Sequence, residues 1–486
     1  MDRRTFIAGA TAALAAPSLI RSARAATTPR VRRDVQSLAP SDPFFAKYAE
    51  AVKKMHDLPD SDPRKWRNQA LIHLNHCPHS KTSFVHWHRH YILNYELICG
   101  QLIGEPDFAL AYWNWSAKSG IIPDPFYDVD QLNVVFWNDP SNAQSDNWNP
   151  APVRTVGKRA LAKGRGLQDD PNAGRFFTQP FIDSIQQTDQ FQIMTGQLET
   201  SPHNNAHTIS GGGTGHMGNG MSPLDPIFWL HHCNIDRIWA EWQTPGNTTP
   251  GFNLNYDNQF VNGTGQPVRA SSASALDFAA MNYTYDTLSS TVVAQQIEQL
   301  GLPKRPPGAA RMAAAAAKTP QILGTAADAK TVVPGVETRF TVAAAGLATN
   351  LFRQRAFLAT KAPTVQRLAI GTGKILAKFS DVTAPDSGAP PIICKVFVNR
   401  QNLLPSTPAT DPLCAGSFSF FGSHGAAHGH GEFYVDLSGP LHVLFNDGAV
   451  DPAKVNIQLM AVTLDSADGA AANATFKVGK VELISA

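Results

Sequence analysis

The sequence is poor in cysteine, in net charge and in long apolar runs. Five cysteines among 486 residues do not make a disulfide-dense scaffold, and the odd count leaves at least one thiol without a partner inside the chain. A formal net charge of +2, with 16% charged residues, argues against a nucleic-acid binder, which normally carries a basic stripe. No apolar run reaches the roughly 18 residues needed to span a bilayer. We therefore expect a globular protein with no nucleic-acid partner and no membrane span. The composition does not reveal the oligomeric state.

The beginning of the chain has the pattern of an export signal. Arg3 and Arg4 precede an apolar run over 7–16, and Ala23-Arg24-Ala25 supplies an A-x-A cleavage site. This order predicts a twin-arginine signal over residues 1–25, which would make the protein periplasmic or secreted. The alternative is a disordered basic terminus.

Composition and periodicity divide the remaining chain into three parts. Residues 26–290 are rich in Trp, His, Asn and Asp, with helical periodicity clearest at 84–103, 192–209 and 226–242, between long loops. Residues 291–332 are rich in Pro and Ala and predict an exposed linker or, equally, a short helix at the alanine run. From 333 to 486, β-branched alternation broken by Gly, Pro, Asn and Asp predicts an antiparallel β-sandwich. The predicted fold is a mainly α domain followed by a β-sandwich domain.

Histidine is concentrated in two stretches of the α domain, at 73–90 and 203–232. Two separate clusters indicate two metal centres, although imidazole suits Cu, Zn, Fe and Ni and does not choose between them. His203 and His207 are four residues apart, so on a helix they share a face and can bind one ion. A third ligand would come from the helix that starts near Pro226. In the first stretch, side chains two residues apart on a helix diverge by about 200°, so only one of His86, His88 and His90 can face a given metal.

Two segments in these stretches resemble the paired copper signatures of the tyrosinase and polyphenol oxidase family. The first reads His79-x4-Phe84-Val85-His86-Trp87-His88-Arg89-x2-Ile92-x3-Glu96 and the second Asp225-Pro226-x-Phe228-Trp229-x2-His232-x3-Asp236. The resemblance covers roughly residues 66–290, and the C-terminal domain more weakly. It implies that the α domain is a helix bundle around a dicopper site.

The resemblance also implies a ligand set. The first copper would be bound by His73, His79 and His88, and the second by His203, His207 and His232. His76 is the adjacent alternative to His73, which we prefer because 69–73 resembles the first-ligand helix of the family. His86, His90 and His231 would pack or hydrogen-bond around the ligands. His56 and His216 would be surface or loop residues.

Three further residues near the ligands have implied roles. In fungal members of the family, a Cys is joined by a thioether to a His two residues later, and Cys77 and His79 have that spacing. The alternative is an ordinary buried thiol. Phe228 precedes His232 by one helical turn and would pack against the site. Asp236 follows it by one turn and would orient Arg or His groups, a purely structural role being an equal interpretation for both residues.

The implied reaction uses dioxygen to hydroxylate monophenols at the ortho position and to oxidise o-diphenols to o-quinones. A phenol has a pKa near 10, so a base helps at neutral pH. Glu199 and Asn204 stand where family members hold a water that takes this proton. A helix-start carboxylate and a solvent-facing amide are the alternatives. The loop 218–224 would form the mouth of the site. Two other functions remain open: a catechol or o-aminophenol oxidase with little monophenolase activity, and a haemocyanin-like dioxygen carrier.

The segment 415–422 resembles part of the shielding domains of latent phenol oxidases, in which an apolar side chain lies over the copper pair. By resemblance to the equivalent domain of the haemocyanin carriers, the residue just before the glycine is the best candidate, so our order of preference for that side chain is Phe421, then Phe420, then Phe418. Strand alternation adds only that Phe421 and Phe420 face opposite ways, so that one of the two points into the site. Cleavage within 301–332 would then activate a latent precursor. The alternative is that these phenylalanines belong to the core of the sandwich.

Outside these segments, a histidine-rich loop, a tyrosine motif and four cysteines also have expected roles. The loop with His424, His428 and His430 would pass copper to the site or be a polar surface loop. Residues 283–285 resemble the terminal tyrosine motif of the family, which pairs with an arginine near the mature N-terminus, here Arg32 or Arg33. Cys394 and Cys414 lie in the same domain and could pair after export. Cys99 and Cys233 would be buried thiols.

Overall fold

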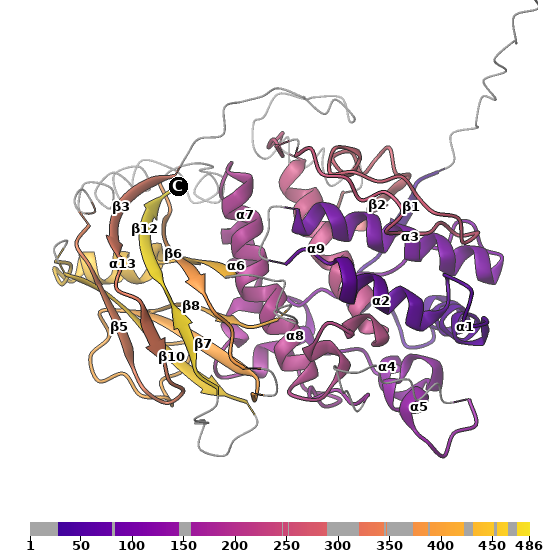
Figure 1. Ribbon diagram of the computed structural model, residues 1–486, viewed down its shortest axis with the longest axis horizontal. Helices are drawn as coiled ribbons and strands as arrows, with labels where there is room; N and C mark the ends of the chain where they lie inside the picture. Colours follow the sequence, from indigo (N-terminus) through magenta and orange to yellow (C-terminus); the bar gives the residue numbers. More distant parts are fainter. Residues whose placement is uncertain are drawn as a thin grey trace, which may run out of the picture.

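The structure is a computed structural model that describes residues 28–79, 83–144, 157–244, 246–250, 252–288, 320–344, 347, 373–386, 389–421, 431–451, 454–464 and 474–486. The predicted export signal, the segment 289–319 of the predicted linker and the loop with His424, His428 and His430 lie outside these residues. Figure 1 shows a helical part beside a β part. None of the helices in the described ranges combines the length and the apolar character that crossing a membrane requires.

The centre of the helical part consists of α1 (Pro43–Asp57), α2 (Trp66–His76), α3 (Phe84–Ile103) and α9 (Ile227–Gln243). Asp42 caps the start of α1 by accepting from the Phe44 N–H, and Gly104 ends α3 with a φ of 73° that favours a residue without Cβ. Helices α3 and α9 are buried over most of their circumference, so they carry side chains into the interior of the protein. Their bounds agree with the predicted helices 84–103 and 226–242.

The predicted helix 192–209 is instead three consecutive elements. These are α7 (Phe191–Leu198), a π-helical turn η6 (Glu199–His203) and α8 (Asn204–Gly211). Pro202 lies inside the π turn, where its missing N–H and its ring disturb the α-helical hydrogen-bond ladder. The turn changes the relative direction of the side chains before and after it.

Shorter helical elements connect the long helices. They are α4 (Pro125–Asp128), α5 (Val134–Asn138) and α6 (Gln179–Gln186), together with the 3-10 turns η1 (Val35–Ser37), η2 (Lys118–Gly120), η3 (Asp130–Leu132), η4 (Leu167–Asp169), η5 (Gly174–Phe177), η7 (His216–Gly218), η8 (Ser222–Leu224), η9 (Ala273–Ala275) and η10 (Asp286–Leu288).

A short parallel pair of strands joins the two ends of the helical part. Strand β1 (Arg30–Arg32) pairs with β2 (Tyr283–Tyr285). Arg32 is fully buried and donates to Glu96 at 2.8 Å and to the Tyr285 hydroxyl at 3.0 Å. Arg33 instead forms an exposed pair with Asp42. Of the two arginines considered for the tyrosine motif, the structure therefore places Arg32 against it.

The β part contains two four-stranded antiparallel sheets, which confirms the predicted fold class. The first has the order β5 (Thr338–Val342), β10 (Val455–Thr463), β7 (Ile392–Val398) and β8 (Cys414–Ser419). The second has the order β3 (Gln321–Ala326), β12 (Lys480–Ser485), β6 (Ile375–Val382) and β9 (Gly431–Asp436). A two-stranded ribbon of β4 (Lys330–Val332) with β11 (Phe476–Val478) and the helix α13 (Ser438–Asn446) complete this part.

The strands of the β part begin earlier than the sequence pattern predicted. Residues 321–326 and 330–332 were assigned to the linker, but they form β3 and β4. These short strands directly follow the Pro/Ala-rich segment, so their sequence pattern was assigned to the linker. Their partners β12 and β11 lie about 150 residues further along the chain. Such long-range pairing leaves little local signal.

The expected Cys394–Cys414 disulfide is wrong. In the β7–β8 register, Cys394 lies opposite Phe418 and Cys414 lies opposite Phe397. Four residues of strand, about 13 Å, separate the positions, and a disulfide needs Cα atoms within about 7 Å. Both thiols are free and buried. The same holds for Cys99 and Cys233, in line with the expectation for those two.

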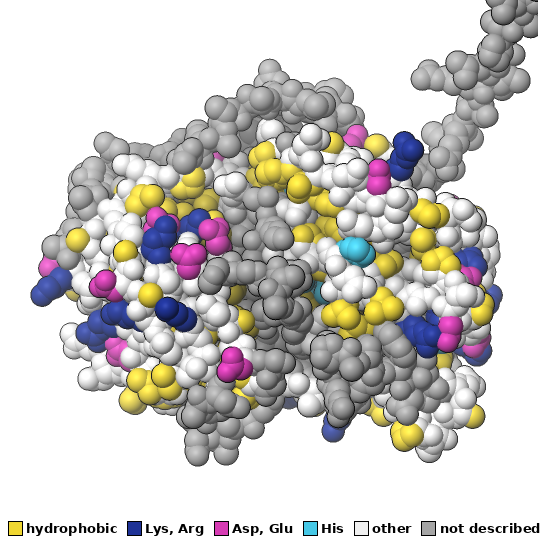
Figure 2. Space-filling view, in the orientation of Figure 1, with side chains coloured by type: hydrophobic (Ala, Val, Ile, Leu, Met, Phe, Trp, Pro, Cys, Tyr) yellow, Lys and Arg dark blue, Asp and Glu magenta, His cyan; other side chains and the backbone are white. Residues whose placement is uncertain are grey.

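The β part docks onto the helical part through β8 and its neighbours. The hydrophobic core of the helical part continues into Ile393, Phe397 and Met460 on the outer face of the first sheet. A separate core lies between the two sheets and contains Phe418. Figure 2 shows Lys and Arg interspersed with Asp and Glu on the visible face of the β part, rather than charge of one sign.

Candidate metal centre

The first group of metal-binding side chains comes from α2, the segment after it, and α3. Ligand atoms of His73, Cys77, His79 and His88 all lie within 4.8 Å of one another, and all four residues are buried. His76, the alternative to His73, is exposed and lies outside this group. On α2 the two positions are three residues apart, and only His73 faces α3. The structure therefore brings together the three histidines predicted for the first copper.

The second group comes from η6, α8 and α9. Ligand atoms of His203, His207, His231 and His232 lie within 4.8 Å of one another, and all four residues are buried. The three predicted histidines are thus joined by His231, which was expected only to pack around them. The His231 ring lies 5.3 Å from the His203 ring and 5.0 Å from Trp115. Sequence spacing missed this member of the group because consecutive residues of a helix normally face different directions.

The two groups adjoin each other in the interior of the helical part. The His88 and His232 rings are stacked, with centroids 4.0 Å apart and planes 5° apart. His79 and His203 also face each other, with ring centroids 5.4 Å apart. The two groups therefore form one centre, in which α3 and α9 contribute a histidine each at its middle.

Hydrogen bonds at Nδ1 orient four of the rings. His88 Nδ1 donates to the Phe84 carbonyl at 2.9 Å, and His203 Nδ1 donates to Asn204 Oδ1 at 2.8 Å. His73 Nδ1 donates to the Gly220 carbonyl at 2.8 Å, and His207 Nδ1 to the Met217 carbonyl at 2.9 Å. A proton held at Nδ1 leaves Nε2 as the acceptor nitrogen, which is the form that binds a metal.

Burial keeps these imidazoles neutral. It lowers the pKa of His88, His203, His207 and His232 well below the ordinary value, and the neighbouring imidazoles lower it further. Burial also lowers the pKa of His231 to about 3. Within the described part of the chain, Nε2 of His203 and Nε2 of His207 are buried without a hydrogen-bond partner. Neutral imidazoles with orphaned acceptor atoms are what a metal ion satisfies, and copper is among the ions that imidazole suits.

Cys77 lies inside the first group. Its Sγ is 3.0 Å from His79 Nε2 and 3.3 Å from His88 Nε2, and burial raises the pKa of the thiol well above its usual value. The sulfur is therefore in contact with the ring to which the thioether would join it. The bond itself remains a prediction.

Glu199 and Asn204 lie beside the two groups rather than at the surface. Glu199 is 7% exposed, with Oε1 3.5 Å from His79 Nδ1. Asn204 is 4% exposed and also donates from Nδ2 to the Ser419 carbonyl at 3.3 Å. The burial of Asn204 argues against a solvent-facing amide, whereas Glu199 does stand in the first turn of η6, as the helix-start alternative has it. Their role in proton transfer remains a prediction.

Phe228 and Asp236 flank His232 on α9. The Phe228 ring lies 4.4 Å from the His232 ring and 5.1 Å from the His73 ring, so it packs against both groups. Asp236 accepts hydrogen bonds from Arg89, Arg32, Tyr283 and Tyr285. Burial opposes ionisation of Asp236, but Arg89 and Arg32 hold its pKa below the usual value. Its contacts are thus with arginines and tyrosines, and they fix α9 to α3 and to the β1–β2 pair.

Sequence reasoning missed the residue that fixes the start of α9. Arg159 is buried and forms a two-pronged ion pair with Asp225, at 2.8 and 2.6 Å. Asp225 Oδ1 also accepts from the Ile227 N–H at 3.0 Å. In the sequence, Asp225 ahead of a buried helix already implied a cationic partner, because a buried carboxylate needs one. No local pattern identifies Arg159 as that partner.

The other histidines that the structure describes lie outside both groups. His86 packs against Phe191 and Trp239, and His90 Nε2 lies 3.0 Å from the Ser271 carbonyl. His56 stacks on Trp137, with ring centroids 3.6 Å apart. His216 was expected at the surface or in a loop, and it lies in η7 with 3% exposure, beside Asn138.

One aromatic side chain of the β part lies over the centre. The Phe421 ring is stacked on the His207 ring, with centroids 3.5 Å apart and planes 6° apart, and lies 5.1 Å from the His79 ring. Phe418 and Phe420 point the other way, into the sandwich, where they lie 4.5 Å from Phe433 and 4.7 Å from Phe476. The structure thus separates the three candidates as strand alternation predicted.

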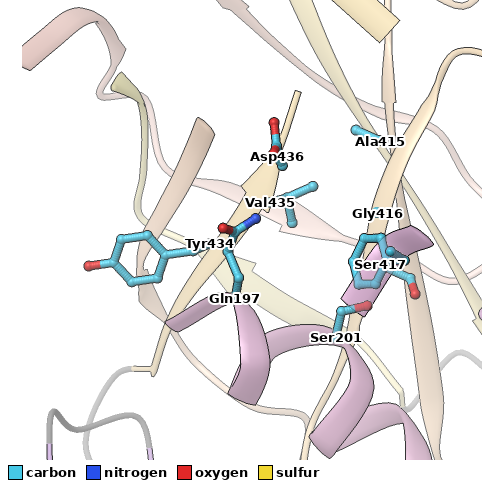
Figure 3. Close-up of a pocket in the computed structure, with 9 residues that line it drawn as sticks. Gln197, Ser201, Ala415, Gly416, Ser417, Tyr434, Val435 and Asp436 are labelled. Atoms are coloured by element: carbon cyan, nitrogen blue, oxygen red, sulfur yellow. The ribbon is translucent and has the colours of Figure 1, made fainter. Parts of the chain in front are cut away.

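Polar contacts hold β8 against α8. Asn205 donates to the Ser417 hydroxyl at 2.9 Å, and the Thr208 hydroxyl donates to the Ser419 hydroxyl at 2.9 Å. Next to these contacts is a small hollow between Gln197 and Ser201 on one side and β8 and β9 on the other (Figure 3). The Tyr434 ring packs so closely on Gly196 that a Cβ there would lie 2.6 Å from it.

Comparison with known proteins connects this arrangement to a family. Residues 47–245 match the family model of the common central domain of tyrosinase. Over 304 residues, the chain is 28% identical to aureusidin synthase of Antirrhinum majus, covering 53% of this chain and 52% of that protein. Over 301 residues, it is 27% identical to a chloroplastic polyphenol oxidase of Spinacia oleracea, covering 53% and 47%. The chain thus spans about half the length of these curated relatives.

The structural comparison covers both parts of the chain. A latent apple tyrosinase superposes with a TM-score of 0.55 at 19% identity, covering 95% of this chain and 98% of that chain. A latent aurone synthase superposes with a TM-score of 0.57, also at 19% identity, covering 94% and 89%. At this identity the likeness is one of fold: a helical part followed by a β part.

Proposed function

Since the helical part of this chain belongs to the tyrosinase and polyphenol oxidase family of dicopper proteins, we propose that the protein oxidises phenols with dioxygen. It would hydroxylate monophenols at the ortho position and oxidise o-diphenols to o-quinones. The observation that carries the proposal is the pair of adjoining histidine groups, buried and neutral, with an aromatic ring already stacked on His207. A substrate phenol that took the place of the Phe421 ring would lie flat against the His207 imidazole.

His73, His79 and His88 would hold one copper, and His203, His207 and His232 the other. When bound, the copper pair supplies the activation of dioxygen and the acceptance of electrons from the phenol. The Phe228 ring packs on the His232 ring, and the His88 and His232 rings stack on each other, so the centre is closely packed on this side. Each ligand ring is held in one tautomer or by packing, so little rearrangement is needed when the metal binds.

Glu199 and Asn204 would manage the phenolic proton. Both are buried at the edge of the centre, one beside His79 and the other bonded to His203. A water held between a carboxylate and an amide oxygen can accept the proton of a bound phenol, whose pKa is near 10 in water. This step matters more for a monophenol than for a catechol, which ionises more easily.

The β part would keep the protein latent. Phe421 occupies the volume beside His207 that a substrate ring needs, and Ser419 engages the amide of Asn204. Cleavage in the part of the predicted linker ahead of β3, followed by release of the β part, would uncover the His207 ring and the Asn204 amide. The paired arginines at the start of the chain support export through the twin-arginine pathway.

Oxygen uptake tests the proposal. We expect the intact protein, loaded with two coppers, to turn over a monophenol and a catechol slowly. Limited proteolysis, followed by gel filtration in dilute urea to separate the two parts, should raise both rates. Separation is needed because Ile393, Phe397 and Met460 contribute apolar contacts between the parts. Copper-loaded protein that takes up no oxygen with either substrate after separation would overturn the proposal, as would full activity with zinc alone.

A further inference from the structure

One loop contacts a histidine from each half of the metal centre. We call residues 211–220 the glycine loop; it leaves the end of α8 and contains η7. Its Met217 carbonyl accepts from His207 Nδ1 at 2.9 Å, and its Gly220 carbonyl accepts from His73 Nδ1 at 2.8 Å. The two histidines belong to different groups, and α2 and α8 are far apart in the sequence. The glycine loop therefore connects the two halves through its backbone.

Close backbone packing determines where these two carbonyls lie. A Cβ on Gly211 would overlap the backbone nitrogen of Gly218, and a Cβ on Gly218 would overlap the carbonyl oxygen of Gly212. The loop also bonds to itself, because Gly215 N donates to Gly211 O at 2.8 Å and Gly218 N donates to Gly215 O at 3.0 Å. Any side chain at these glycines forces the backbone to shift, and the carbonyls shift with it.

Side chains fix the second half of the loop. Asn219 Oδ1 accepts from the Met221 N–H at 2.9 Å, and Asn219 Nδ2 donates to the Gly215 carbonyl at 3.2 Å. Met217 and Met221 are fully buried. The backbone between the two accepting carbonyls is thus held at both ends.

We propose that the glycine loop is a shared positioning element that fixes one histidine at each of the two copper sites. An imidazole whose Nδ1–H is held by a fixed carbonyl presents Nε2 in one direction, and loss of such a bond typically lowers metal affinity by about 10- to 100-fold. A shift of this loop disturbs two such bonds at once. The proposal rests on the proposed dicopper function, but it concerns copper binding rather than turnover.

The test is copper binding by the full chain carrying Gly218→Ala. Copper content after purification and competition with a chelator of known affinity give the occupancy of each site. We expect the affinity of both sites to fall by about 10- to 100-fold. His88→Ala and His207→Ala serve as references, each emptying one site. Loss of copper from one site only, or wild-type affinity at both, overturns the proposal.

Two further variants separate positioning from general damage. Gly174→Ala is the matched control, because a Cβ there overlaps the carbonyl oxygen of Gln168 as closely as a Cβ on Gly218 overlaps that of Gly212. It should lower the melting temperature and leave copper affinity unchanged; an equal loss of copper overturns the proposal. If Gly218→Ala does not fold, Asn219→Ala removes the two side-chain bonds without overlap, and it should weaken both sites to a similar, smaller extent. A fall at one site alone contradicts the shared role.

Turnover distinguishes this inference from the proposed function. A protein that binds two coppers but oxidises no phenol refutes the function, while the copper affinities of the loop variants still decide the role of the loop.

Discussion

The six predicted ligands and their neighbours are held by specific atoms. Four of the rings have a hydrogen bond at Nδ1, and His232 is held by stacking on His88 and by contact with Phe228. His231 is adjacent to His232 and equally buried, yet only one of two consecutive helix residues, which differ by roughly 100° in direction, is expected to bind the metal.

The assignment of His232 is tested by a neighbouring pair of substitutions. His232→Ala should reduce copper from about two per chain to about one and abolish nearly all oxygen uptake, because it removes a ligand. His231→Ala should retain both coppers. Atomic absorption on the purified proteins measures this. The reverse result would transfer the ligand role to His231.

Glu199 is tested by comparing two substrates. Glu199→Gln keeps the size of the side chain but removes its charge, so monophenol hydroxylation should fall by about 10-fold or more, while catechol oxidation should fall less. The measurement is kcat for each substrate with the β part removed. Glu241→Gln is the control, because Glu241 pairs with Arg237 away from the centre. Equal losses on both substrates would leave Glu199 with a structural role only.

The contact between Cys77 and His79 has a covalent test. If the thioether forms, a tryptic peptide that contains both residues should weigh two hydrogen atoms less than the unmodified sum, and Cys77 should resist alkylation. Cys99 and Cys233 are buried thiols in the same protein and should be alkylated after denaturation. Alkylation of Cys77 under the same conditions, in protein that had been active, would exclude the bond.

At the scale of elements, β8 and the segment after it divide their side chains between two environments. Ser417 and Ser419 meet α8, Phe418 enters the sandwich, and Phe421 reaches the metal centre. This one segment therefore contributes side chains both to the core of the β part and to its contact with the helical part.

This division predicts opposite effects for two similar substitutions. Phe421→Ala should raise the activity of the intact protein toward that of the separated helical part, because it vacates the space beside His207. Phe418→Ala should instead cost about 3–5 kcal/mol of stability, because it leaves a cavity between the sheets. Oxygen uptake and urea unfolding measure the two effects. An intact Phe421→Ala protein that stays as slow as the wild type would show that Phe421 does not block the site.

The whole molecule combines a buried cluster of neutral imidazoles with a β part docked over it. Apolar contacts of Phe397 and Met460 accompany polar ones from Ser417, so the two parts are held by more than the linker. The overlap expected of any side chain at Gly196 shows how closely α7 approaches β9.

Acid should destabilise the copper-free protein. Burial lowers the folded-state pKa of His231 to about 3, and that of four other imidazoles in the centre well below the ordinary value of 6.5. Between the folded-state and unfolded-state pKa values, these imidazoles are therefore protonated in the unfolded chain and neutral in the folded one. For His231, the stabilising contribution is complete above pH 6.5 and is lost as the pH falls from about 6.5 toward about 3.

Urea unfolding at several pH values measures this dependence. Each such histidine contributes a slope of about 1.4 kcal/mol per pH unit once the pH is well below 6.5. His231→Phe should remove one such slope. Unchanged stability between pH 7 and pH 5 would contradict the neutral state of the cluster.

The sequence by itself determined the fold class, the two histidine stretches and the order of the parts. These follow from local quantities: helical periodicity, strand alternation, and a spacing of four residues between His203 and His207. Alternation along a strand, also a local property, indicated that Phe420 and Phe421 point opposite ways, while the preference for Phe421 came from the resemblance to the carrier proteins.

Only the tertiary structure decided the rest. It placed His73 rather than His76 in the first group, brought His231 into the second, paired Arg32 rather than Arg33 with Tyr285, and separated Cys394 from Cys414. It also brought the carbonyls of Met217 and Gly220 to two different ligands. Each of these depends on how distant elements pack against one another. Contacts between backbone atoms and residues far apart in the chain leave no periodic trace in the sequence, because no local propensity specifies which distant partner an element will meet.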